Sequence, residues 1–484
     1  MEHGLRACLI ATRLADRVGV SAEVADDVFW VSLLAMVGCS ADSYEVHLVW
    51  GDDIALRAGM FEAGPSQAAM ARYLLSRAGS DGGPARRATA SARLLASGMR
   101  AAAESMTAHC QVTGQLAEQL RFGTSVSEPL QHAFARWDGK GLPRGTGGEE
   151  IELAARVFTV ANYVEVQQRL HGAEGAIAFL RRCAGSLMDP SLVEALASTV
   201  DEVFGDLGEE SWDAVITAEP VGRPRLVGDG LDAALAALGD FADLKAPWFS
   251  GRSRRVAELA AAAAEGLRLP AAEVACLRRA ALVHGLGRTG IPNTIWDKPG
   301  PLTPTEQERM HLYPYFTDRI LRRGSLRELA DLASSPHERL DGSGYPRGLQ
   351  GAAIGQPARV LAAASDYDAL TSLRPQRPAL GAEQAARLLR EEAAAGRLDG
   401  DAVEAVLVAA GHASRRRRPA PADLTAREVE VLRLIATGHT TASVAAQLNI
   451  SPKTADRHIQ HIYGKIGASN RSLATLFAMR NGLL

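Results

Sequence analysis

A ten-residue turn motif occurs twice in this 484-residue chain, and the two copies lie 203 residues apart. Residues 136–145 read RWDGKGLPRG, and residues 339–348 read RLDGSGYPRG. The match continues beyond the turn, because Ala155-Arg156-Val157 and Ala358-Arg359-Val360 follow at the same offset. A single repeat of this length is unlike the short period of a solenoid and predicts two homologous domains.

The first copy carries an insertion that the second copy lacks. The segments around Gly38 and Gly287 also align, but at an offset of 249, which places the insertion near residues 40–91. A Pro- and Gly-containing segment, 219–224, would interrupt any helix and marks a boundary. We therefore predict a first domain at 1–218, a second at 225–412, a basic Pro-containing linker at 413–421 and a small third domain at 422–484.

The composition is typical of a globular chain rich in helix. Apolar residues make up 47%, charged residues 23% and aromatic residues 5%, which excludes a fibre and wholesale disorder. Alanine runs such as Ala260 to Ala264 favour helix, because alanine loses no side-chain entropy there. The predicted fold class is all-α, with two helical bundles followed by a small helical module.

The cysteines and the N-terminus indicate a reducing compartment. The five cysteines are scattered and never spaced as Cys-x-x-Cys, so neither a disulfide framework nor a zinc knuckle is predicted. No basic region followed by a long apolar stretch opens the chain, and the best apolar run, Val28 to Val37, is too short to span a bilayer. We expect a cytoplasmic location and no membrane partner.

Charge is divided unevenly along the chain. From Arg415 to Leu484 there are eleven Lys and Arg against four acidic residues, a net charge of +7 on a chain whose total is −3. The rest of the chain therefore carries −10, and a basic end on an acidic body predicts a polyanion partner for the end alone. The run Arg415 to Arg418 fits either a solvated linker or additional phosphate contacts.

The last sixty residues have the pattern of a helix-turn-helix. Thr425 and Glu428 form a capping box at one helix start, and a short helix over 441–448 ends at Asn449, which tolerates a tight turn. The next helix begins at Ser451-Pro452, and its exposed face is hydrogen-bonding and cationic. Such a stripe directly after a tight turn suits the DNA major groove, with an ordinary solvated face as the alternative. The stripe consists of Lys453, Asp456, Arg457, Gln460, His461 and Lys465.

These residues resemble the LuxR-type helix-turn-helix family across about 422–484. The resemblance rests on LTAREVEVL from Leu424, on Ser451-Pro452-Lys453-Thr454 and on Lys465-Ile466-Gly467. It implies a double-stranded DNA partner and dimer contacts through the helix around 473–480. By the resemblance Asp456, Arg457 and Gln460 face bases, whereas Lys453, Thr454, His461 and Lys465 lie nearer phosphates. Ser443 and Ala455 depart from the family's usual Glu and Val, and Asp456 fits either a cytosine contact or a local cap.

The second copy resembles the HD-GYP family of cyclic di-GMP phosphodiesterases across roughly 249–411. The resemblance rests on LVHGLGRTGIP from Leu282, on HERLDGSGYPRG from His337 and on DALTS from Asp368. It implies a helical bundle that holds two or three iron- or manganese-class ions with His and Asp ligands. Such ions activate water and clamp both the attacking and the leaving oxygen of a phosphodiester.

Most of the positions that hold metal in that family are substituted in this chain. Only His284 and His337 remain, and two imidazoles cannot hold a catalytic metal cluster. We therefore expect no cofactor and no hydrolysis, with residual iron or manganese binding as the alternative. The substituted positions are Arg252, Gly285, Tyr313, Pro336 and Ser365.

The substrate side of the family pattern is better preserved than the metal side. Tyr345, Arg347, Arg374 and Arg377 provide an aromatic ring and cations that suit a nucleotide or another small effector. The same residues could instead only hold the turn together. The first copy departs further from the pattern, with Ala35-Met36 in place of His-Asp, and is interpreted as a structural or dimerising partner.

Taken together, the sequence predicts a homodimeric DNA-binding transcriptional regulator. Two degenerate HD-GYP-like domains would form a sensory and dimerisation body, followed by a LuxR-type DNA-binding domain. One alternative is a metal-dependent phosphodiesterase, of the cyclic di-GMP type, fused to a DNA-binding domain. Another is a protein-interaction scaffold with no small ligand.

Overall fold

The computed structural model describes residues 2–60, 62, 66–80, 82–97, 100–205, 211–411 and 421–484. The chain divides into two compact units, Met1–Leu226 and Val227–Leu484. Every regular element in the described ranges is a helix, accompanied by a few isolated β-bridges, which confirms the all-α prediction. Apart from Pro421, the predicted linker 413–421 lies outside the described residues, and Arg415 to Arg418 lie outside them too.

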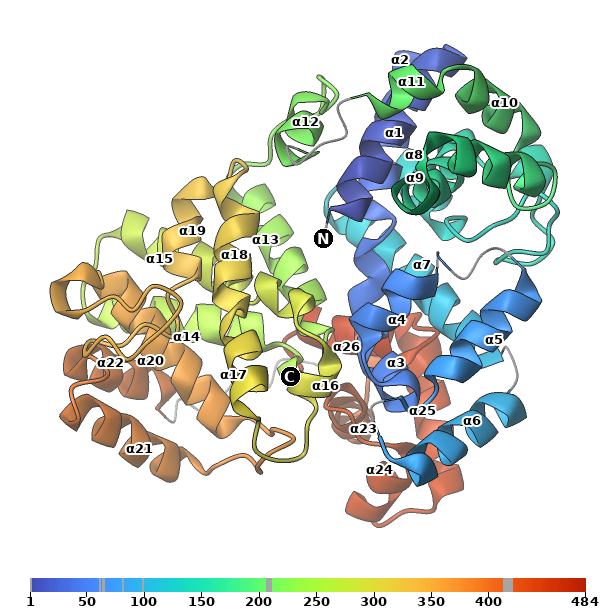
Figure 1. The fold of residues 1–484 in the computed structure, drawn as a ribbon. Coiled ribbons are helices and arrows are strands. Elements are labelled where there is room, and N and C mark those ends of the chain that lie inside the picture. Colours follow the sequence, from blue (N-terminus) through green and yellow to red (C-terminus); the bar gives the residue numbers. More distant parts are fainter. Residues whose placement is uncertain are drawn as a thin grey trace. The chain divides into compact units, whose positions relative to one another are not determined.

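The first unit is a helical bundle whose core includes α9, a long helical segment that is kinked at Gly172 (Figure 1). α1, α2 and α9 pack together around an apolar core that includes Leu14, Val31 and Phe158. The predicted insertion near 40–91 folds as short helices around a small core of its own, with Trp50 and Leu74 at its centre. The helices are α1 (His3–Val18), α2 (Ala22–Leu34), η1 (Val37–Ser40), α3 (Ser43–Trp50), α4 (Asp53–Met60), α5 (Gln67–Arg77), α6 (Pro84–Ser97), α7 (Arg100–Gln119), α8 (Thr124–Gln131), η2 (Gly148–Glu150), α9 (Leu153–Cys183), α10 (Pro190–Ser198), α11 (Val200–Phe204) and α12 (Ser211–Thr217).

The second unit begins with another helical bundle (Figure 1). α14 packs against α15, α20 and α22, and the alanine run at Ala260 to Ala264 lies on α14, where small side chains allow close helix packing. Its helices are α13 (Gly228–Asp243), η3 (Pro247–Phe249), α14 (Arg252–Gly266), α15 (Ala271–Val283), η4 (Leu286–Gly290), α16 (Asn293–Trp296), α17 (Pro304–His311), α18 (Tyr313–Arg322), α19 (Arg327–Ala333), η5 (Gly351–Ala353), α20 (Gln356–Thr371), α21 (Ala382–Ala394) and α22 (Gly400–Ala410).

The C-terminal helices follow the boundaries that capping signals predict. They are η6 (Pro421–Asp423), α23 (Ala426–Ala436), α24 (Thr441–Gln447), α25 (Pro452–Ile466) and α26 (Arg471–Arg480). Thr425 and Glu428 form the capping box of α23, and the Ser451 hydroxyl accepts from the Thr454 amide at the start of α25. Asn449 has a φ of 51°, the left-handed conformation expected between α24 and α25. Ala455, Ile459 and Ile462 are buried, as the spacing predicts.

The repeated turn has the same backbone hydrogen bonds in both copies. Leu142 N donates to Phe134 O at 3.0 Å, and Tyr345 N donates to His337 O at 3.1 Å. A Cβ on Gly344 would lie 2.5 Å from His337 O, which is closer than real Cβ atoms approach, so only glycine fits. The local structure therefore repeats along with the sequence.

Membrane-spanning potential is weak in the described helices. None of them alone is long and apolar enough to cross a bilayer, although the bent pair Ala22–Ser40 and Ser43–Trp50 meets the length and composition criteria together.

Candidate nucleic-acid interface and buried arginine cluster

The exposed face of α25 carries four unengaged polar side chains. Lys453, Asp456, Arg457 and Gln460 are exposed, and within the described residues their side chains make no hydrogen bond or ion pair. The opposite face of α25 is held in the domain core by its apolar residues, so the helix can present this stripe without losing its own packing. The arrangement leaves donors and acceptors free for base edges and phosphates.

The other predicted DNA contacts on α25 are engaged within the domain. His461 Nδ1 donates to Glu428 Oε1 at 2.9 Å, and Lys465 Nζ donates to Glu428 Oε2 at 2.8 Å. Thr454 shares a hydroxyl hydrogen bond of 2.8 Å with Ser451 in the first turn. Because Glu428 is also the capping-box residue of α23, these contacts join α23 to α25.

Glu428 is a buried carboxylate stabilised by several donors. Burial alone would raise its pKa, but hydrogen bonds from Lys465, Thr425 and His461 hold that pKa at about 2. Its side chain is only 4% exposed. The carboxylate therefore stays ionised through the physiological range.

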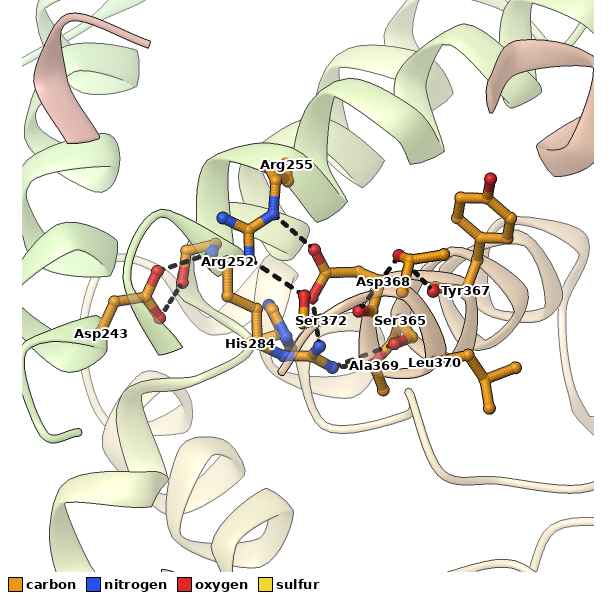
Figure 2. Close-up of polar contacts among 12 residues, drawn as sticks. Asp243, Arg252, Arg255, His284, Ser365, Tyr367, Asp368, Ala369, Leu370 and Ser372 are labelled. Atoms are coloured by element: carbon orange, nitrogen blue, oxygen red, sulfur yellow. Dashed lines mark hydrogen bonds and ion pairs between the residues drawn. The ribbon is translucent and has the colours of Figure 1, made fainter. Parts of the chain in front are cut away.

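In the second bundle, the pocket that would hold metal in the resembled family is filled by arginines. Arg252, at the first turn of α14, donates to the Asp368 carboxylate, and its Nη2 donates to Ser365 Oγ at 2.8 Å (Figure 2). Arg255 Nε donates to Asp368 Oδ1 at 2.7 Å. Asp368 is buried, and although burial raises its pKa, Arg255 and Arg252 lower it below its ordinary value.

A second buried ion pair lies beside the first. Arg288 Nη1 donates to Asp243 Oδ1 at 3.1 Å, and Ser253 contributes both its amide and its hydroxyl to the same carboxylate. Burial raises the pKa of Asp243 to about 6, even though Arg288 acts to lower it. The Arg288 guanidinium also lies 4.6 Å from the centre of the Phe249 ring.

The two remaining histidines are neutral and hydrogen-bonded. His284 Nδ1 donates to Ala281 O at 2.6 Å, and its Nε2 accepts from Arg288 Nη2 at 2.6 Å. His337 Nε2 is hydrogen-bonded to the Tyr313 hydroxyl. Burial first, and then nearby arginines, holds the pKa of both rings well below the ordinary value. Neither ring carries a positive charge at neutral pH.

This residue set does not fit a cluster of divalent ions. His284 uses both ring nitrogens in protein hydrogen bonds, and the guanidinium of Arg252 lies against the carboxylate of Asp368. Asp366, one position after the substituted Ser365, accepts from Arg339 at 2.8 Å. In the described part of the chain, no group of three or more His, Cys, Asp or Glu side chains is placed to bind a metal ion.

The predicted effector contacts each have partners within the second bundle. Arg347 donates to Asp331 at 2.7 Å on the surface, and Arg377 donates to the backbone carbonyls of Leu370, Ala369 and Pro378. Arg374 lies 4.4 Å above the Trp248 ring. Tyr345 is stacked between His311 and His337, at centroid distances of 3.8 and 4.8 Å. Arg377 thus secures the end of α20, which is the structural role left open for it.

The sequence did not predict three of the residues that form the buried ion pairs of this arginine cluster, which consists of Arg252, Arg255 and Arg288 with Asp368 and Asp243. Asp243 was in no motif, Arg255 was not singled out, and Asp368 was read only as part of a family motif. Asp243 precedes its partner Arg288 by 45 residues, and Arg252 precedes Asp368 by 116. The appearance of Arg252 at a metal-ligand position was the one signal available, because a buried arginine needs a carboxylate.

A model of the HD domain family matches this chain at residues 96–192 and 237–402, one segment in each unit. A second model, described as bacterial regulatory proteins of the luxR family, matches residues 422–478. The fold and the two matches define a class of protein in which a C-terminal LuxR-type DNA-binding domain is fused to a helical HD-domain body. The chain belongs to the HD domain family.

Several curated relatives are phosphodiesterases. The chain is 30% identical over 396 residues to 3'3'-cGAMP-specific phosphodiesterase 3 of Vibrio cholerae, covering 81% of this chain and 86% of that protein. A crystal structure of a cyclic GMP-AMP specific phosphodiesterase of that organism matches with a TM-score of 0.58 at 26% identity, covering 84% of this chain and 92% of the other. A cyclic di-GMP phosphodiesterase response regulator of Xanthomonas campestris is 40% identical over 128 residues, covering 26% of this chain and 34% of that protein.

Proposed function

We propose that this protein is a DNA-binding transcriptional regulator whose HD-like domains act as a signalling body without hydrolysis. The observation that carries the proposal is the exposed stripe of α25, in which Lys453, Asp456, Arg457 and Gln460 have no partner among the described residues. A helix that leaves such groups unengaged directly after a tight turn has the properties of a recognition helix. The net charge of +7 after residue 414 also favours a polyanion partner.

The body is proposed to work through dimer geometry. A dimer bound to DNA must place two recognition helices about one helical turn apart to match two half-sites. Binding of a nucleotide, another small molecule or a protein to the body would change that spacing and thereby the affinity for DNA. The buried salt bridges of the second bundle would keep it folded without any metal, because the guanidinium groups of Arg252, Arg255 and Arg288 are each paired with a carboxylate.

Replacing Arg457 with alanine should weaken binding to the cognate duplex roughly 10- to 100-fold, because one bidentate base contact contributes about 1–3 kcal/mol. The duplex is first selected with the wild-type protein from a random library, and affinity is measured by fluorescence anisotropy at fixed salt. Arg387→Ala is the matched control, since it removes the same charge from an exposed side chain of α21. Equal losses in both variants would contradict the assignment of α25.

The second candidate function is that of a metal-dependent phosphodiesterase, and the relatives' activity favours it. Against it, the guanidinium groups of Arg252 and Arg288 occupy the region where divalent ions would be needed. We expect protein purified without chelator to contain well under one equivalent of iron or manganese per chain. We also expect no turnover of 3'3'-cGAMP or cyclic di-GMP after either ion is added. Stoichiometric metal with turnover would establish the enzyme.

A further inference from the structure

The first unit contains a cavity between α7 and the helices of the insertion. Its volume is about 70 Å³, and it is partly open to solvent. The wall is largely apolar and includes Met36, Trp50, Leu56, Met106 and Phe134. The cavity has room for a small group only, and its apolar wall favours a group that is itself apolar.

This cavity is the first copy's counterpart of the arginine-filled pocket. A Cβ on Gly38 would collide with His109 O and Thr113 Oγ1, just as one on Gly287 would collide with Tyr313 O and Thr317 Oγ1. His109 therefore takes the place that Tyr313 has in the second copy. Ala35-Met36 stands where the family has its His-Asp pair. The first copy therefore lacks these two metal-binding side chains and has a cavity at this place.

A cluster of four reactive or charged side chains lines the cavity: Cys39, Asp42, Arg57 and His109. His109 Nε2 donates to Ala35 O at 2.6 Å, and the same imidazole interacts electrostatically with Cys39. Arg57 is paired with Asp42, and its buried Nε atom has no hydrogen-bond partner among the residues that the structure describes. Cys39 thus shares an apolar-walled cavity with a histidine and an arginine.

The thiol of Cys39 differs from the other four thiols of the chain. Burial alone would raise its pKa, but Arg57 and His109 lower the pKa below the ordinary value. Burial raises the pKa of Cys8 and Cys110 to about 12, and it also raises the pKa of Cys183 and Cys276. Cys39 is therefore the thiol with the greatest thiolate fraction at neutral pH.

We propose that Cys39 is a nucleophile that forms a covalent adduct with apolar α,β-unsaturated carbonyl compounds that enter this cavity. The Cys39 thiolate attacks the β-carbon, and a sulfur–carbon bond forms as the carbon–carbon π pair moves to give an enolate. The His109 imidazolium then gives its proton to the enolate and becomes neutral. The product is a thioether, and no oxidant or other co-reactant is consumed. The apolar wall selects the body of the electrophile, and the Cys39–His109 pair supplies the chemistry.

The test uses the wild-type full-length protein and limiting N-phenylmaleimide, an apolar acceptor of this class. Peptide mass spectrometry follows the labelling rate of each cysteine between pH 5.5 and 8.5. Cys276 is the internal control, because it is partly exposed like Cys39 but has a raised pKa. We expect Cys39 to react about tenfold faster than Cys276 at pH 6, and we expect its rate to rise at a lower pH than that of Cys276, because its pKa is lowered and that of Cys276 is raised. Equal rates, or rates that climb with pH in the same way at both residues, would overturn the proposal.

Two further measurements separate the cavity from a generally reactive thiol. The preference of Cys39 for N-phenylmaleimide over 3-maleimidopropionate should exceed that of Cys276 by about an order of magnitude, because the anion is costly to bring against an apolar wall. Equal preferences would refute selection by the cavity. In His109→Gln the rise of the Cys39 labelling rate should move to higher pH, and an unchanged profile would exclude the proposed role of His109.

Discussion

Replacing Asp368 with alanine is expected to destabilise the second bundle by about 3–5 kcal/mol, because it leaves two guanidinium groups buried or half-buried without a counter-charge. Asp368 is 5% exposed and bridges Arg252, itself 4% exposed, to Arg255. Native-state hydrogen exchange on the full chain measures the free energy of local opening. In the variant, the backbone amide protons of α14 and α20 should exchange faster than in the wild-type protein.

A surface carboxylate that, like Asp368, pairs with two arginines provides the control. Asp331 also bridges two arginines, Arg322 and Arg347, but its side chain is 73% exposed. Asp331→Ala should therefore change the opening free energy by less than about 1 kcal/mol. Similar losses in the two variants would mean that burial of the Asp368 cluster is not what makes it important.

A compensated variant tests the same idea from the other side. In Arg252→Met/Asp368→Leu the buried ion pair is replaced by apolar groups, and much of the stability lost in Asp368→Ala should return. If the double variant were as unstable as the single one, the cost would lie in packing around Asp368 rather than in an unpaired arginine.

Replacing Glu428 with alanine is expected to destabilise the C-terminal domain by about 2–4 kcal/mol, because a helix cap and two charged hydrogen bonds are lost together. Glu428 closes the capping box of α23 and binds both His461 and Lys465 of α25. Faster exchange should appear in α23 and α25, and the matched variant Glu430→Ala on the same helix should change little, because Glu430 makes only an exposed pair with Arg427.

The contribution of Glu428 to the stability of the C-terminal domain depends on pH in a defined direction. The pKa of Glu428 in the folded chain is about 2, below its ordinary value of 4.5. Its stabilising contribution is therefore fully present above about pH 4.5 and is lost as pH falls toward 2. In the wild-type protein, α23 and α25 should lose exchange protection in that window. An acid response that is identical in Glu428→Ala would rule out this carboxylate as its source.

Local signals in the sequence predicted much of the DNA-binding domain. The capping box at Thr425, the cap at Ser451 and the turn at Asn449 involve residues within a few positions of one another, and the structure has all three. The exposed stripe of α25 followed from helical periodicity for the same reason. Periodicity could not show that His461 and Lys465 are bound to Glu428, 33 and 37 residues away.

Residue type does not specify which partners the arginines of the second bundle contact. The sequence offered Arg377 either as an effector contact or as a residue that holds the turn together, and its guanidinium donates to backbone carbonyls at the end of α20. Arg252 stands at a position that holds metal in the resembled family, and its guanidinium donates to Asp368 and Ser365. Which carboxylate neutralises which guanidinium depends on how α14, α20 and η4 pack.

The sequence by itself determined the helical class and the helix starts of the C-terminal domain, and it predicted the internal duplication and the loss of the family's metal ligands. These follow from short-range geometry and from positions within motifs. Only the tertiary structure brought Asp243 to Arg288, Asp368 to Arg252, and Cys39 to Arg57 and His109. Those partners come from separate helices, and their pairing is decided when the apolar faces of the helices pack together and exclude water from the charges between them.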